Sequence, residues 1–285
     1  RDIGQPLAMS VATAAAGIAE IVDETMASAA RVHAVENGKD TNGRMLIATG
    51  GAAPLHAARL AQKLGIDSVV VPVGAGVGSA HGFLHAPIGY EVVRTRFMRL
   101  EAFDSGAVNE LFAQMRAEAE AVVRLGAPET PLGERREAFM RYRGQGHEIT
   151  VTLPLKEYVG ADSSALRSLF DEQYMQVFGR VIPGLEVEVI TWALTLATEH
   201  ELPGKTAATT PKAAPTAQST RRLFDPGTEQ HVDAAVYARD QLEPGMQLAG
   251  PAVIVEPQTA TVVPPNFSLS VDQNGHLILT REARI

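Results

Sequence analysis

Two adjacent glycines and a nearby histidine are the residues whose types and spacing best suit ligand binding. Gly50 and Gly51 are followed by Ala52 and Ala53, and His56 comes shortly after them. Glycines let a ligand approach the backbone closely, and the first turn of a following helix offers unpaired N–H groups to an anion. We therefore predict a ligand-binding turn at these residues. A tight turn without any ligand requires the same glycines, so the local pattern leaves that alternative open.

Two further pairs of residues have side chains that could do chemistry. His81 and His85 have the i, i+4 spacing that presents two imidazoles on one helical face to a metal ion. No third ligand is evident for them, so we predict no metal site. His147 and Glu148 pair a base with an acid, but neighbouring residues on a strand point to opposite faces. We expect a structural or interface role for them, and the catalytic residues stay unknown.

The predicted ligand-binding turn lies within a strand–turn–helix–strand pattern. Residues 45–48 and 69–71 are apolar runs, and between them an amphipathic helix ends at Gly65. This order is typical of a parallel α/β sheet, in which ligands bind beyond the carboxyl ends of the strands. Residues 74–86 are rich in small side chains. They are predicted to pack a helix tightly against the glycine turn.

Longer elements are predicted on both sides of this pattern. An alanine-rich helix over residues 10–38 should pack closely on the sheet. Helical periodicity returns in residues 104–126 and 161–179. Residues 139–153 look like two strands joined by a glycine turn, and residues 185–197 alternate as one long strand.

These elements suggest a division of the chain into four parts. Residues 1–98 hold the α/β pattern, and residues 99–202 form an α+β region. Residues 203–220 contain few large apolar side chains and are expected to be a mobile linker. Short strand-like runs separated by turn residues then predict a β-rich C-terminal module over residues 221–285.

Composition excludes several classes of function. The chain has 285 residues, a net charge of -8 and no cysteine. The negative charge and the lack of a basic stripe argue against nucleic-acid binding. The absence of cysteine rules out disulfides and thiolate chemistry, and fits a cytoplasmic location. No run approaches the ~20 apolar residues that cross a bilayer, so no membrane span is expected.

Seven segments spread along nearly the whole chain resemble one known family. They are residues 26–40, 50–57, 74–77, 140–149, 174–180, 250–256 and 260–265. In sequence and in order they are similar to the hydantoinase A family, the ATP-dependent group of hydantoinases, 5-oxoprolinases and acetone carboxylases. The resemblance implies the last layers of an actin-like (ribonuclease H-like) ATPase domain, followed by a β-rich module. It also implies that Gly50, Gly51, Ala52, Ala53 and His56 lie at the adenosine of a bound nucleotide.

The resemblance further implies a heteromeric enzyme that uses ATP and Mg. Such an enzyme phosphorylates the carbonyl of a small cyclic amide, and a hydantoinase B-type subunit then completes ring opening. The phosphate- and Mg-binding motifs of the family are absent from this sequence. The resemblance therefore implies that the N-terminal part of a hydantoinase A-type subunit is a further partner.

Two other functions remain open at this stage. A ketone carboxylase subunit of the acetone or acetophenone type would have the same fold and the same ATP site. A non-catalytic scaffold would keep the fold without nucleotide, and Ala53 gives this alternative some support because the family usually has glycine there. Nothing in the residues separates a carboxylase from a hydrolase, since a few pocket contacts decide the substrate.

Overall fold

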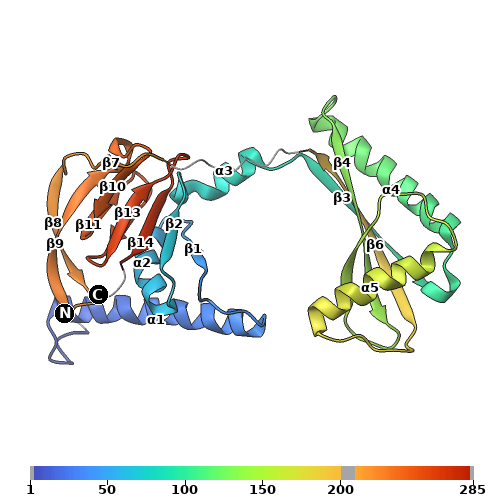
Figure 1. Ribbon diagram of the computed structural model, residues 1–285, viewed down its shortest axis with the longest axis horizontal. Coiled ribbons are helices and arrows are strands. Elements are labelled where there is room, and N and C mark those ends of the chain that lie inside the picture. Colours follow the sequence, from blue (N-terminus) through green and yellow to red (C-terminus); the bar gives the residue numbers. More distant parts are fainter. Residues whose placement is uncertain (1–2, 200–208, 283–285) are drawn as a thin grey trace. The chain divides into compact units, whose positions relative to one another are not determined.

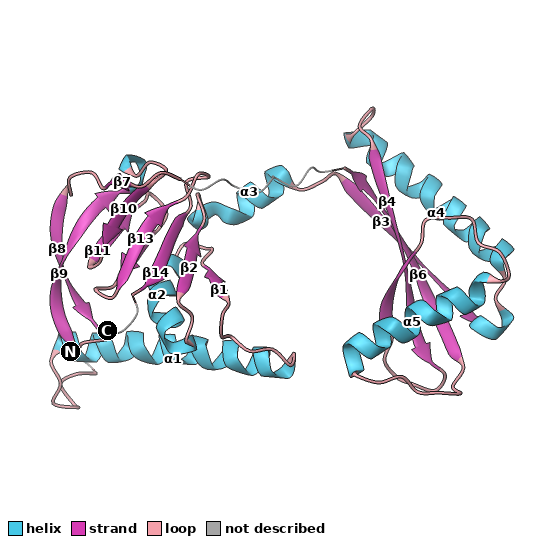
Figure 2. Cartoon of the chain, viewed as in Figure 1, coloured by secondary structure: helices cyan, strands magenta, loops and turns pink. Residues whose placement is uncertain are grey.

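The chain folds into two compact units, each with its own hydrophobic core. The computed structural model describes residues 3–199 and 209–282. Arg1–His85 and Gly204–Ile285 together form the first unit, and Ala86–Pro203 forms the second unit. Figure 1 follows the chain through both units, and Figure 2 shows that each of them combines helices and strands.

A six-stranded sheet that uses both ends of the chain lies at the centre of the first unit. Its strands, in order, are β1 (Met45–Ile47), β2 (Ser68–Val71), β14 (Leu277–Arg281), β13 (Phe267–Val271), β10 (Met246–Ala249) and β7 (Lys212–Ala213). β1 and β2 are parallel, whereas β14 runs antiparallel to β2 with Leu279 opposite Val69. Residues 221–285 were expected to form a separate β-rich module, but their strands β10, β13 and β14 share this sheet with β1 and β2. Both Val69 and Leu279 are fully buried, so one shared core removes their apolar surface from water.

A second, four-stranded sheet completes the first unit. Its order is β12 (Ala260–Val263), β11 (Ala252–Val255), β9 (Gln230–Ala238) and β8 (Ser219–Asp225). The helix α2 (Ala53–Leu64) contacts β2 of the first sheet and β12 of the second. Ala57, Ala58 and Ala61 of this helix are buried, and their small side chains allow the close approach.

The segment 203–220, expected to be a linker, is described only in part. Residues 203–208 lie outside the described residues. Beyond them, Lys212–Ala213 pairs with β10, the N–H of Gln218 donates to the carbonyl of Val236 at 2.8 Å, and β8 already begins at Ser219. Backbone pairing of this kind needs no large side chains, which is why the composition gave no sign of it.

The predicted N-terminal helix is present as α1 (Val11–Glu36), and Ser10 caps it by accepting from the N–H of Thr13 at 3.0 Å. The expectation that it packs closely on the sheet was wrong. α1 packs on α2 instead and buries only Asp23 and Ala27, while Ile21 stays exposed. Other large apolar side chains of this helix, among them Ile18 and Val35, stay exposed as well. In the described parts of the chain, no helix is long and apolar enough to cross a membrane.

The second unit is a four-stranded antiparallel sheet packed against two helices. The strand order is β3 (Gly89–Arg99), β6 (Val187–Thr198), β4 (Leu132–Tyr142) and β5 (Ile149–Leu153), and the helices are α4 (Ser105–Gly126) and α5 (Asp162–Phe178). The predicted helices and the strands of residues 139–153 and 185–197 are confirmed. No strand was predicted where β3 lies. The predicted division at residue 98 had assigned nearly all of β3 to the first part of the chain, whereas the structure assigns it to the second unit.

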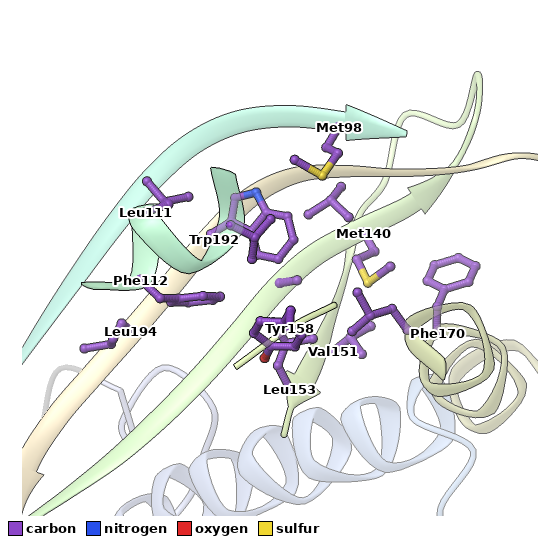
Figure 3. Packing of buried hydrophobic residues seen from close by; sticks show 14 of the residues in the cluster. Met98, Leu111, Phe112, Met140, Val151, Leu153, Tyr158, Phe170, Trp192 and Leu194 are labelled. Carbon is purple, nitrogen blue, oxygen red and sulfur yellow. The ribbon is translucent and has the colours of Figure 1, made fainter. Parts of the chain in front are cut away.

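Trp192 on β6 lies at the centre of the second unit's core (Figure 3). It is fully buried, its Nε1 donates to the carbonyl of Arg96 at 3.0 Å, and its ring meets that of Phe112 edge to face at 5.7 Å. The hydrogen bond satisfies the one polar group of the indole, so burial of this large side chain leaves no polar atom of the ring unpaired.

Candidate functional site

The glycine turn is the first of two turns that meet at the carboxyl ends of β1 and β2. Gly50 has φ +107°, a conformation that glycine adopts without strain. Its N–H donates to the carbonyl of Ala75 at 2.7 Å, and Ala75 begins a short 3₁₀ turn, Ala75–Val77, that follows β2. This hydrogen bond joins the predicted ligand-binding turn to the segment of small residues, 74–86.

The beginning of α2, just beyond this turn, has no side-chain cap. Ala52 is the N-cap residue and has no side-chain oxygen, and Pro54 stands in the first turn. The first N–H groups of a helix have no partner inside the helix, so an uncapped end leaves donors and a positive dipole end for an anion or a polar ligand.

A cavity of about 330 Å³ opens between the two turns. It is lined by Thr49, Gly50, Gly76, Gly78 and Ser79. A Cβ atom built on Gly50 or on Gly78 would meet nothing within 4 Å, so the lining is open backbone at both positions. A flat group could therefore lie directly against the main chain there. Ser79 belongs to the short helix α3 (Gly78–His85).

The turn between β11 and β12 packs closely against the two turns at the carboxyl ends of β1 and β2. A Cβ atom on Gly76 would be 2.7 Å from the Cβ of Gln258, and one on Gly51 would be 3.5 Å from the Gln258 carbonyl oxygen. Gly76 is thus required for this close approach. Sequence reasoning missed Gln258, because no local pattern marks a residue whose partners lie so far away in the chain.

A partly buried ion pair lies at the base of the β11–β12 turn. Nε of Arg239 is 3.9 Å from Oε1 of Glu256, and the N–H of Glu256 donates to the carbonyl of Thr259 at 2.9 Å. Burial raises the pKa of Glu256 and lowers the pKa of Arg239, since each charged form loses its hydration. Other nitrogens of Arg239 donate to the carbonyls of Leu242 and Gly275, which fix the guanidinium in place.

His56 does not line the cavity at the glycine turn. Its Nδ1 is 2.8 Å from Oδ1 of Asp23 on α1, and the Asp23 side chain is only 6% exposed. His56 lines a different cavity from that of the glycine turn, between α1, α2 and the second sheet. Of the five residues predicted to bind a nucleotide, the structure thus places Gly50 at the cavity of the turn, keeps Gly51, Ala52 and Ala53 next to it, and turns His56 toward Asp23.

The other histidines singled out in the sequence differ in their surroundings. The ring of His81 lies against Gly74, where an added Cβ would be 2.6 Å from Nε2. The described residues contain no group of three or more His, Asp or Glu side chains placed to hold a metal ion. His147 and Glu148 are exposed in the loop between β4 and β5, next to Gln145, whose amide donates to the hydroxyl of Tyr174 at 2.8 Å.

Two protein-family profiles together match nearly all of the chain. The profile of hydantoinase/oxoprolinase proteins matches residues 1–92, and that of the hydantoinase/oxoprolinase C-terminal domain matches residues 107–282. The chain belongs to the hydantoinase/oxoprolinase family. The resemblance inferred from the seven sequence segments is confirmed.

The individual relatives are longer than this chain. Over 98% of its length the chain is 30% identical to the caprolactamase subunit alpha of Pseudomonas jessenii, of which it covers 41%. Its structure resembles that of the ATP-dependent caprolactamase of the same organism, with 29% identity, a TM-score of 0.76 and coverage of 99% of this chain and 42% of that one. The chain thus spans about two fifths of the length of these relatives.

A ketone-converting enzyme has the same fold. The nucleotide-free structure of acetone carboxylase, from work on ATP-dependent acetone carboxylation, has a TM-score of 0.77 and 25% identity over 98% of this chain and 41% of that one. The predicted fold class, a mixed α/β and α+β structure with part of an actin-like ATPase domain, is confirmed by these two structural relatives.

Proposed function

We propose that this chain is part of an ATP-dependent hydrolase of cyclic amides and supplies one wall of its nucleotide site. The observation that carries the proposal is the cavity between the glycine turn and the Ala75–Val77 turn, beside the uncapped start of α2. Gly50, Gly51, Ala52 and Ala53 would lie against the adenosine. The described relatives support ATP use, because two structures of the family come from ATP-dependent enzymes.

The residues of the cavity fit an uncharged group such as an adenine ring or a ribose. Gly50 and Gly78 leave open backbone, and Ser79 can donate or accept a hydrogen bond. The cavity lining contains no cation and no carboxylate. The triphosphate and Mg²⁺ need cationic or N–H donors and carboxylates, respectively, which the N-terminal part of a hydantoinase A-type subunit would supply.

The chemistry would then be divided between polypeptides. When bound, ATP supplies the phosphoryl group that makes an amide carbonyl a better electrophile. This chain's residues orient the nucleoside end and exclude water from one side of it. A hydantoinase B-type subunit would complete the ring opening of the small-molecule substrate. A ketone carboxylase subunit is the second candidate, because the structure of acetone carboxylase is also similar to that of this chain, with a TM-score of 0.77.

Two glycines of α3 provide a matched test. Gly78 lines the cavity and has helical backbone angles, and a Cβ atom built on it would meet nothing within 4 Å. A Cβ atom on Gly82 would also meet nothing within 4 Å, but Gly82 does not line the cavity. Gly78→Val would place a branched side chain in the cavity without strain. We expect it to weaken ATP binding by the assembled complex at least tenfold in calorimetric titration, while Gly82→Val leaves the affinity unchanged. Equal affinity of both variants and the parent protein would contradict the nucleotide assignment. Turnover assays with ε-caprolactam and acetone then distinguish the hydrolase from the carboxylase.

A further inference from the structure

A second cavity in the first unit, of about 260 Å³, shares no residue with the cavity at the glycine turn. It lies between α1, α2 and the strands of the second sheet. Most of its lining is apolar, including Ala19, Leu55, Phe224, Val263 and Pro265. Its volume is just below the usual range for ligand pockets, which begins at about 300 Å³, so it suits a small molecule.

The polar side chains of this cavity are paired with one another or with their neighbours. Arg59 donates to Glu20 at 3.0 Å and to Gln62 at 3.0 Å. Gln62 donates in turn to Asn266 at 2.9 Å, and Asp225 accepts from the hydroxyl of Thr228 at 2.7 Å. No cation is left over to neutralise an anionic ligand, which favours an uncharged one.

His56 differs from these polar groups because, in the described part of the chain, only one of its two ring nitrogens is paired. Its Nδ1 faces the carboxylate of Asp23, which is acceptor-only when ionised, so Nδ1 carries the hydrogen and donates it at 2.8 Å. In the neutral imidazole, Nε2 is then an acceptor. Among the described residues it has no hydrogen-bond partner, and the His56 side chain remains 27% exposed within the cavity lining.

We propose that this cavity binds a compact, uncharged and mainly apolar molecule that donates one N–H or O–H hydrogen bond to Nε2 of His56. Asp23 is a positioning residue, since it fixes the tautomer and the direction of the imidazole. Small cyclic amides and cycloalkanols belong to this class. The site needs no nucleotide, so it stands or falls independently of the proposed ATP site.

The first test compares a lactam with and without its N–H and adds an alcohol as a second donor. Binding of ε-caprolactam, N-methylcaprolactam and cyclohexanol to the purified protein is measured without nucleotide by calorimetry or ligand-observed NMR. We expect ε-caprolactam and cyclohexanol to bind saturably, and N-methylcaprolactam, which lacks the N–H, to bind at least tenfold more weakly. If neither donor probe saturates, or if the methylated lactam binds equally well, the proposal is overturned.

The second test uses substitutions on the exposed side of α1. Ala19 lines the cavity and Ala15, one turn earlier, does not, and both are exposed. Ala19→Trp should close the cavity and abolish binding without disturbing the core, and Ala15→Trp should bind like the parent. His56→Leu should weaken ε-caprolactam at least tenfold. Unchanged binding by Ala19→Trp would place the lactam elsewhere and refute the site, whatever the result of the ATP titrations.

Discussion

Gln258 and Gly76 touch so closely that a Cβ atom on Gly76 would be 2.7 Å from the Cβ of Gln258. Gly76 belongs to the turn after β2, and Gln258 belongs to the turn between β11 and β12. The C-terminal part of the chain therefore supports the two turns that form the candidate nucleotide site. Gln258 also lies near Gly51, where an added Cβ would be 3.5 Å from its carbonyl oxygen.

Gly76→Ala is predicted to disturb this contact. The added methyl group must push Gln258 away, and overpacking of this kind costs about 1–3 kcal/mol. We expect a lower midpoint in urea unfolding and weaker ATP binding by the assembled complex. Gly82→Ala is the control, because its Cβ would meet nothing within 4 Å and alanine favours a helix. If the two variants bind ATP equally well, the contact with Gln258 does not support the site.

The Arg239–Glu256 pair predicts a particular pH dependence. Burial raises the pKa of Glu256 above its ordinary value of 4.5. A raised pKa means that the folded state holds the proton more tightly than the unfolded state. The stability contributed by this group is therefore fully present below pH 4.5 and is lost as the pH rises through the folded-state value.

Glu256→Gln removes this titration while keeping the shape of the side chain. The free energy of unfolding of the variant, minus that of the parent, should increase as the pH rises from 4 through the raised pKa of Glu256. Urea unfolding at a series of pH values measures this difference. A difference that stays constant, or that falls with pH, would show that the carboxyl group is not raised in pKa by its surroundings.

The His56–Asp23 pair predicts an asymmetric mutant cycle. His56→Ala leaves the nearly buried carboxylate of Asp23 without its imidazole partner, which should cost about 1.5–3 kcal/mol. Removing both side chains also removes the group that needed a partner. We therefore expect the double variant, His56→Ala with Asp23→Ala, to be more stable than His56→Ala alone in urea unfolding. Additive losses would mean that the two side chains act independently.

Phe112 tests the core of the second unit. It is 1% exposed and meets Trp192 edge to face, so Phe112→Ala should lower the free energy of unfolding by about 3–5 kcal/mol. Trp192 is the only tryptophan of the chain, and its fluorescence reports the unfolding of this unit directly. Phe97→Ala is the control within the same unit, since Phe97 is 55% exposed. Equal losses from the two substitutions would contradict the described core.

The sequence by itself determined those features that depend on a few neighbouring residues. Helix ends follow from local chemistry, as when Ser10 caps α1 and Gly65, with φ +70°, ends α2. Apolar periodicity located β1, β2 and the helices of the second unit. The glycine pair marked a turn whose backbone stays open. The family resemblance came from segments of this local kind.

Only the tertiary structure decided which distant segments meet. β14 pairs with β2, Gln258 supports Gly76, and His56 turns to Asp23 rather than to the glycine turn. β3 was missed because it follows the predicted turn segments without a clear alternation of buried residues, and its pairing with β6 fixes it. The physical reason is common to all of these. Propensity and periodicity act over one or two turns of chain, whereas pairing depends on shape and burial between surfaces that form only when the whole unit has folded.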